Sequence, residues 1–446
     1  MDTSKTAGDV TQRATHQLLL INRNFALLWS GQAVSLLGDF VFNTTLVVWI
    51  AAVLAQGQAW TPLAVSGIFL AASAPTILFG PLAGVLVDRW DKRLAMFWTS
   101  LLQALCVALL LLQVSITTAR QIGAVWQLGI LYLVVFLVNS CEQIFRPSMT
   151  VLIGKIVAQN EQAKAIGLGQ VSLSLAMMIG PALAPPILLA FGVHWALLVN
   201  MLSFLASAST IFFMRVPQDR QGTTSKEHTD FLAEFREGAH FLFNNQLLRS
   251  MLILSMIAWI AGGALAALDI FFATQNLHTT PALYGVLDTA LGIGSILGAI
   301  LASMFSERLG LIRLLWGSVL ALGVAMLIYA RLTGFGPALI LIFLTGIPFA
   351  TMGVVSGPLL LRATPKELLG RISALFNPLS TVALLLGTAT AGYLDSLLSG
   401  HFHVTFAGLT FGPVDTIFTG AGLLLLVAGL YAMLSLHRAD EADHAS

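Results

Sequence analysis

The chain has 446 residues, of which 57% are hydrophobic and 10% are charged, and its mean hydropathy is +0.86. A soluble domain keeps about a quarter of its residues charged, so this composition excludes an ordinary soluble protein. The net charge of +1 gives no reason to expect a nucleic-acid partner. The chain instead repeats apolar runs of about 20 residues, the length that a helix needs to cross the hydrocarbon of a bilayer.

Twelve such runs predict an all-α membrane protein with twelve transmembrane helices. In chain order we expect them at 25–54, 62–87, 94–117, 125–149, 166–190, 194–214, 250–273, 281–305, 311–331, 337–361, 372–396 and 414–436. This spacing predicts an N-terminal six-helix bundle over 1–214, a cytoplasmic linker over 215–249 and a C-terminal six-helix bundle over 250–446. Charged hairpins recur at matching places in the two halves, which indicates two related bundles around a central path.

The linker and the basic residues predict how the chain meets the membrane. Phe231, Phe235, Ala239 and Leu242 share one face of a possible helix, which favours an interfacial helix on the inner leaflet. All of the 22 lysines and arginines except Arg120 and Arg331 fall on one side of the twelve spans. Because cytoplasmic loops retain basic residues, we expect both termini to be cytoplasmic.

The loop between the second and third runs, GPLAGVLVDRWDKR over 80–93, is unusually charged. It resembles the signature loop of the major facilitator superfamily, with Asp91 where that pattern usually has glycine. The resemblance, together with the loop's chemistry, suggests a conformational latch, in which a glycine lets a neighbouring helix approach and charged side chains bridge the two bundles. The latch residues are Gly84, Asp88, Arg89, Lys92 and Arg93. The alternative is a basic loop that only sets the topology.

Further segments resemble a branch of bacterial exporters that includes drug, macrolide and siderophore efflux proteins. These segments are NRNFALLWSGQAVSLLGD over 22–39, Arg146-Pro147, and EFREGAHFLFNN over 234–245. The resemblance implies the major facilitator fold with two pseudo-symmetric bundles, alternating access, proton antiport and a multi-pass place in a bacterial-type plasma membrane. It also implies a cavity lined by helices one, four, seven and ten, which makes cavity-wall candidates of Asn43, Asn139, Trp259, Thr345 and Thr351.

The fifth helix carries Gly180-Pro181, which resembles the glycine-proline motif of superfamily antiporters. Alanine and proline replace the trailing glycines of that motif, at Ala184 and Pro185-Pro186. A proline frees a carbonyl and bends a helix. The bend either influences which side of the bundle opens or only serves packing.

Acidic residues inside the spans are candidates for proton coupling, because they are costly in a membrane and usually functional. Asp39 lies in the middle of the first helix, one turn before Asn43. A carboxylate there could take a proton from one side and release it to the other; alternatively it is a packing residue satisfied by neighbouring donors. Glu142 and Arg146 lie four apart in the fourth helix, which favours an ion pair on one face, with a proton relay through Glu142 as the alternative.

Other polar groups give weaker signals. Asp269 and Asp288, expected near the outer ends of helices seven and eight, could attract a cationic substrate, and Asp288 is kept as a cavity candidate. For Asp269 a solvated helix end is the favoured interpretation. Outer-loop residues are expected to face water (Asp395, Asp415) or to form at most a weak metal motif (His401-x-His403), and the two cysteines (Cys106, Cys141) to be core residues.

The sequence therefore favours a proton-coupled exporter of amphiphilic or hydrophobic small molecules. One alternative is a dedicated exporter of a metabolite such as a siderophore; another is a membrane sensor or scaffold on the same fold. We expect no enzyme activity, because no phosphate-binding glycine loop or nucleophile elbow is present. We expect no cofactor and no metal. The expected partners are a small-molecule substrate, protons and the lipid bilayer; the oligomeric state is open, and a monomer is plausible.

Overall fold

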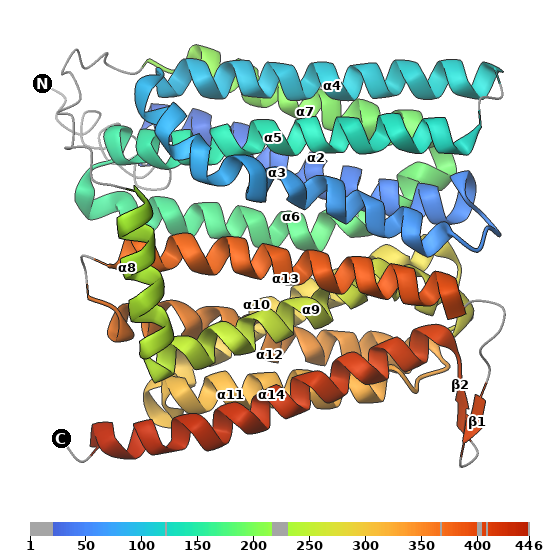
Figure 1. Ribbon diagram of the computed structural model, residues 1–446. Helices are drawn as coiled ribbons and strands as arrows, with labels where there is room; N and C mark the ends of the chain where they lie inside the picture. The colour runs from blue at the N-terminus through green and yellow to red at the C-terminus, as the bar shows by residue number, and fades with distance from the viewer. Residues whose placement is uncertain are drawn as a thin grey trace, which may run out of the picture.

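The computed structural model describes residues 21–120, 123–215, 231–365, 368–398, 404–406 and 409–444. Within them, twelve helices are long and apolar enough to cross a membrane. A shorter helix and a two-stranded hairpin complete the described chain (Figure 1). The predicted all-α architecture with twelve spans is confirmed, and the short hairpin was not expected.

The elements follow the predicted order closely. The first half has α2 (Arg23–Trp49) with its π-helical extension η1 (Ile50–Leu54), α3 (Thr61–Arg89), α4 (Lys92–Arg120), α5 (Ala124–Ile156), η2 (Gln159–Glu161), α6 (Gln162–Phe191) and α7 (Val193–Phe213). After α8 (Phe231–Asn244), the second half has α9 (Gln246–Gln275), η3 (Pro281–Leu283), α10 (Tyr284–Leu309), α11 (Leu311–Tyr329), α12 (Phe335–Ala363), α13 (Leu369–Leu398), β1 (Val404–Phe406), β2 (Leu409–Phe411) and α14 (Pro413–His444). β1 and β2 are antiparallel.

Two helices continue well past their expected ends: α14 ends at His444 where 436 was expected, and α5 ends at Ile156 where 149 was expected. Helix α5 passes through Pro147, because a proline removes only one backbone donor and membrane helices tolerate that loss where neighbours pack around them. Leu152, beyond the proline, is buried in a cluster with Leu28 and Met96. Tertiary packing therefore extends α5 past position 149, its expected end.

The two halves repeat the same packing order. In the first half α2 packs on α6 and α7, α3 on α5, and α4 on α5 and α7. In the second half the equivalent contacts are α9 with α13 and α14, α10 with α12, and α11 with α12 and α14. The halves lie side by side (Figure 1) and meet mainly through α3 with α13 and α6 with α10. The protein is thus built from two pseudo-symmetric six-helix bundles.

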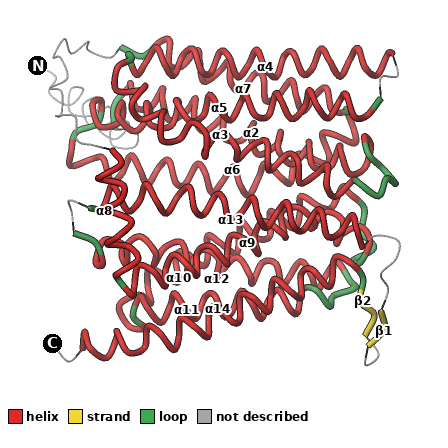
Figure 2. The backbone as a smooth tube through the Cα atoms, viewed as in Figure 1, coloured by secondary structure: helices red, strands yellow, loops and turns green. Residues whose placement is uncertain are grey.

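The two ends of the bundle differ. At one end, here called the α8 end, α2 begins, α14 ends and α8 runs across the spans (Figure 1). The β1–β2 hairpin marks the opposite end, here called the hairpin end (Figure 2). On α8, Leu242 is buried and packs with Leu248 and Ile372, and Ala239 packs on the same cluster. At these two positions the predicted membrane-facing surface of α8 contacts protein.

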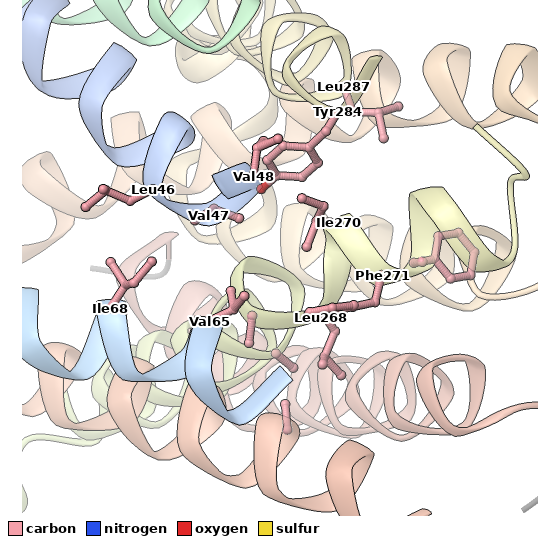
Figure 3. Close-up of a cluster of buried hydrophobic side chains, with 14 of the residues drawn as sticks. Leu46, Val47, Val48, Val65, Ile68, Leu268, Ile270, Phe271, Tyr284 and Leu287 are labelled. Atoms are coloured by element: carbon pink, nitrogen blue, oxygen red, sulfur yellow. The ribbon is translucent and has the colours of Figure 1, made fainter. Parts of the chain in front are cut away.

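A hydrophobic cluster joins the two halves toward the hairpin end. Val47 and Val48 of α2 and Val65 of α3 belong to the same buried cluster as Leu268 of α9 and Leu287 of α10. Figure 3 shows these side chains converging from both halves. Buried apolar side chains of both halves therefore pack together in this region.

Candidate functional site

A pocket of about 300 Å³ opens within the second half of the bundle. Side chains of α9 to α12 form most of its wall, and Phe69 of α3 reaches it from the first half. Its volume is at the lower end of the range for small-molecule sites. The wall is largely apolar, with a small set of polar groups: Asp269, Tyr284, Asp288, Tyr329 and Thr345.

Asp269 is the most enclosed carboxylate of the pocket. Its side chain is only 4% exposed, and the Tyr329 hydroxyl donates a hydrogen bond of 2.6 Å to its Oδ1. The expectation that Asp269 is a solvated helix end is wrong. α9 continues to Gln275, so Asp269 lies more than one turn inside the helix. There it packs under Tyr329 of α11.

Asp288 is the second carboxylate, one helical turn after Tyr284 on the same face of α10. Its charge and that of Asp269 act on each other. Among the described residues, none donates a hydrogen bond to Asp288 or forms an ion pair with it, and the described pocket wall contains no lysine, arginine or histidine. The pocket therefore holds two acidic groups without a protein cation to balance them.

The cavity candidates from the sequence divide into two groups. Trp259, Asp288 and Thr345 line the pocket. The others do not: the amide of Asn139 donates to Val135 O, Thr351 is buried and donates to Ile347 O, and Asn43 is exposed on α2.

Sequence reasoning missed the two tyrosines and Phe69 as pocket residues. The one available signal was the four-residue spacing between Tyr284 and Asp288, which places both on one helix face. Tyr329 and Phe69 come from other helices, so only the fold brings them to the site.

Asp39 is positioned by tight packing of the residues on either side of it. Gly38 lies against Ser203 of α7, and Phe40 lies against Gly180 of α6. Because successive residues in a helix are about 100° apart, Asp39 projects from neither of these packed faces. Its side chain is half-buried, and the charges of Glu142 and Arg146 on α5 act on it.

Glu142 and Arg146 form the ion pair that their spacing predicted. Arg146 Nε lies 2.8 Å from Glu142 Oε1, and the arginine side chain is 68% exposed while that of the glutamate is 21% exposed. The amide of Gln103 lies 3.5 Å from the second carboxylate oxygen of Glu142. With Asp39 these residues make a charge cluster of two carboxylates and one cation, called here the α2–α5 cluster.

In the loop at 80–93, the hydrogen bonds of Arg93 are made within the first half. Arg93 donates from Nε to Ile211 O at 3.1 Å and also bonds Phe212 O, near the end of α7. A cation is favourable at that position because helix carbonyls carry partial negative charge. Arg93 thus contacts backbone carbonyls, whereas an acidic side chain across the bundle was expected. The packing around Gly84 and the side chains of Asp88 and Arg89 lie outside the described residues. Lys92 donates to Trp90 O at 3.0 Å.

Asp91, the departure from the family pattern, has a structural explanation. Its Oδ1 accepts a hydrogen bond from the Leu94 backbone N–H at 2.9 Å, and its carbonyl accepts one from Ala95 N–H. This is the geometry of a helix N-cap. Asp91 therefore stabilises the first turn of α4.

The Gly180-Pro181 segment lies where three helices meet. A side chain at position 180 would overlap Phe40 of α2, and a Cβ at Gly285 of α10 would overlap the carbonyl of Pro181. The hydroxyl of Thr289 on α10 also donates to Met178 O of α6 at 2.8 Å. This segment connects the helix that carries Asp39 with the helix that carries Asp288.

Two expectations about the predicted outer loop are wrong. Asp395 and Asp415 do not face water, since they are 2% and 7% exposed. Asp415 accepts hydrogen bonds from Asn276 Nδ2 and Gly412 N, because the start of α14 packs against the end of α9. His401 and His403 lie outside the described residues, which contain no group of three potential metal ligands. Cys106 and Cys141 are buried and free, as expected.

Twelve candidate membrane-spanning helices in two repeated halves are the architecture of transporters of the major facilitator type. A family model described as transmembrane secretion effector matches residues 18–445, so the chain belongs to this family. The family and its relatives are transporters, and the expectation that the protein is not an enzyme is confirmed.

Two curated relatives match most of the chain. An uncharacterised MFS-type transporter of Bacillus subtilis (strain 168), YfiS, is 26% identical over 91% of this chain and 92% of its own length. Macrolide efflux protein A of Streptococcus pyogenes is 22% identical over 81% of this chain and 87% of its own length. The predicted resemblance to the efflux branch is therefore confirmed.

Solved structures show the same fold at low identity. A bacterial homologue of the iron transporter ferroportin in an inward-facing state has a TM-score of 0.67 at 17% identity, covering 93% of this chain and 98% of that one. The nucleoside transporter NupG has a TM-score of 0.67 at 13% identity, covering 93% of this chain and 99% of that one.

Proposed function

We propose that the protein is a secondary active transporter that exports amphiphilic or hydrophobic small molecules in exchange for protons. The observation that carries the proposal is an apolar pocket in one half of the bundle, combined with the membrane-embedded α2–α5 cluster in the other. Relatives that are efflux proteins, among them macrolide efflux protein A and a Lactococcus lactis homologue of the multidrug resistance efflux pump PmrA, support export. Both termini would be cytoplasmic, in a bacterial plasma membrane.

Protonation of Asp39 would change the charge of the α2–α5 cluster. With Asp39 and Glu142 ionised and Arg146 positive, the cluster carries one net negative charge; one proton on Asp39 makes it neutral. A neutral cluster costs less to enclose in a low-dielectric environment than a charged one. Proton binding would therefore favour the arrangement in which the cluster is shielded from water, which is the basis of alternating access.

Two parts of the fold would convert this preference into movement. Gly180-Pro181 joins the helix of Asp39 to α10, where the halves are in contact. The loop over 80–93, with Gly84, Asp88, Arg89, Lys92 and Arg93, would act as a latch at the α8 end. Exchange of Asp88 for Asn should then shift the inward/outward population, measured by spin-label distances across the α8 end, and unchanged transport and population would exclude the latch.

The coupling role is tested by flux in proteoliposomes with an imposed pH gradient. We expect substrate movement driven by the gradient in wild type and its loss in Asp39→Asn, because the asparagine carries no exchangeable charge. Glu161→Gln removes a carboxylate from the turn before α6 and serves as the matched control, with flux at the wild-type level. Gradient-driven flux at the wild-type rate in Asp39→Asn would contradict proton coupling through this residue.

The same flux assay separates the other functions that the sequence left open. A sensor or scaffold shows no saturable flux for any compound. A dedicated exporter of one metabolite shows no competition between chemically unrelated compounds. Saturable flux with mutual competition among unrelated amphiphiles is the result that we expect.

A further inference from the structure

We propose that the pocket of the second half binds an amphiphilic organic cation, with Asp288 as the group that recognises its positive charge. This inference rests on the proposed function and names the substrate class of the same pocket. It goes beyond that proposal because an exporter of amphiphilic compounds has no general need for a carboxylate in its binding pocket.

The polar groups of the pocket are divided unequally. Asp269 is nearly fully buried and already accepts a hydrogen bond from Tyr329. Asp288 has no hydrogen-bond or ion-pair partner among the described residues, and it faces the same cavity. The Tyr329 hydroxyl thus partly compensates Asp269, and Asp288 remains the carboxylate available to a ligand.

The charge of the pocket favours a positive ligand. Its described wall contains two carboxylates and no basic side chain, and the charges of the two aspartates act on each other. A carboxylate enclosed by apolar groups is costly unless an opposite charge approaches it. A ligand with one positive charge would supply that charge, and an anionic ligand would be repelled.

The rest of the wall favours an organic cation over a metal ion. Hard metal ions require several oxygen ligands, and the described residues contain no group of three His, Cys, Asp or Glu. The pocket is instead lined by the aromatic residues Phe69, Trp259 and Phe349, and its wall also contains Leu291 and Met352. Aromatic rings attract organic cations, and aliphatic groups accommodate their apolar parts.

The test is equilibrium binding to the full-length protein in lipid nanodiscs with two probes. Tetraphenylphosphonium carries one positive charge on an apolar aromatic body, and triphenylphosphine oxide has a similar body without net charge. In wild type we expect saturable tetraphenylphosphonium binding and at least tenfold weaker binding of the oxide. Binding is followed by tryptophan fluorescence, and the part of the signal change that is lost in Trp259→Phe arises in the pocket.

Two substitutions at one position and a distant control isolate the carboxylate. Asp288→Asn should weaken tetraphenylphosphonium binding at least tenfold and leave oxide binding unchanged. Asp288→Glu should restore cation binding to within about threefold of wild type, because it keeps the charge. Glu161→Gln, in the turn before α6 and outside the pocket wall, should bind both probes like wild type.

The inference is overturned if wild type does not bind tetraphenylphosphonium, if it binds both probes equally, or if Asp288→Asn binds the cation like wild type. Its failure is distinguishable from that of the proposed function. Asp288-dependent binding without flux in proteoliposomes would reject transport and keep the cation site. Proton-driven flux of neutral compounds without Asp288-dependent binding would keep the transporter and reject the cation site.

Discussion

The α2–α5 cluster and the pocket of the second half both place two carboxylates within membrane-spanning helices, but in different surroundings. In the α2–α5 cluster, Arg146 pairs with Glu142 and has a side chain that is 68% exposed. In the pocket, Asp269 is 4% exposed and the described wall has no basic residue. The first site has its own cation, with a largely exposed side chain; the described wall of the second site has no cation.

We propose that this difference corresponds to different tasks for the same type of residue. Because the α2–α5 cluster contains a cation, its net charge is only minus one or zero when Asp39 loses or gains a proton. Both charge states have a modest energetic cost in the membrane, which suits the binding and release of a proton. Two carboxylates without a cation in an apolar enclosure are most stable when something positive joins them. Repeated halves of one fold thus allow coupling and substrate recognition to be separated in space.

The largest expected effect on transport comes from disrupting the contact between α6 and α10. Gly285→Leu places a side chain against the Pro181 carbonyl, and overpacking of this kind costs about 1–3 kcal/mol. Because membrane helices rely on small residues for close approach, we expect the halves to be unable to close and the initial transport rate to fall at least tenfold.

The matched control for this prediction is Gly317→Leu on α11, where no atom lies within 4 Å of the added Cβ. Its transport rate, normalised to the amount of reconstituted protein, should stay within about twofold of wild type, as is usual for substitutions away from tight packing. Equal rates for the two variants would show that the α6–α10 contact does not have to close during transport.

Measuring both flux and ligand binding for a variant of each site tests whether the two sites have separate roles. Asp39→Asn should lose gradient-driven flux and still bind tetraphenylphosphonium within about threefold of wild type, because effects at separate sites are nearly independent. Asp288→Asn should show the reverse for neutral substrates, with gradient-driven flux retained. Isothermal titration in nanodiscs measures binding, and flux in proteoliposomes measures transport. Each variant is purified once and divided between the two assays. Equal losses in both assays for both variants would mean that the two sites act as one.

Tyr329→Phe tests whether Asp269 is compensated inside the pocket. The substitution removes the hydroxyl that donates to Asp269 and keeps the ring that packs against Phe272 and Phe418. A buried hydrogen bond to a charged group contributes about 1.5–3 kcal/mol, so we expect a clear fall in the thermal unfolding midpoint in detergent. Asp269→Asn should remove most of the further effect of Tyr329→Phe, and additive losses would contradict a direct interaction.

The fold was predictable because its signals are local. Apolar length defines a span, and the charged loops separate the spans, so the expected helices match the observed ones to within a few residues except at the ends of α5 and α14. The Glu142–Arg146 pair was predictable for the same reason, since both residues lie on one helix face. The Asp91 N-cap is locally encoded as well, since its side chain accepts from the backbone N–H of Leu94 three residues later, although it was not among the expected features.

The pocket was not predictable because its carboxylates depend on contacts between helices. Asp269 looked like a helix end in sequence; the observed α9 ends two residues later than expected, and Tyr329 from α11 covers the carboxylate. Asp395 and Asp415 were misjudged in the same way, since an acidic residue near a predicted loop is solvated only if no other helix packs on it. Burial of such residues follows from tertiary packing, which hydropathy along the chain does not record.

The smallest expected effect concerns the ion pair of the α2–α5 cluster. Because Arg146 is largely exposed, a pair at this helical spacing should contribute only about 0.3–0.5 kcal/mol to stability. A double-mutant cycle with Glu142→Gln and Arg146→Gln, measured by thermal unfolding at low and high salt, gives this interaction energy directly. It should shrink further at high salt, because exposed charges are screened. An interaction energy above about 1.5 kcal/mol would be typical of desolvated charges. The two carboxylate sites would then have the same kind of environment. The proposed separation of proton coupling from substrate recognition would lose its physical basis.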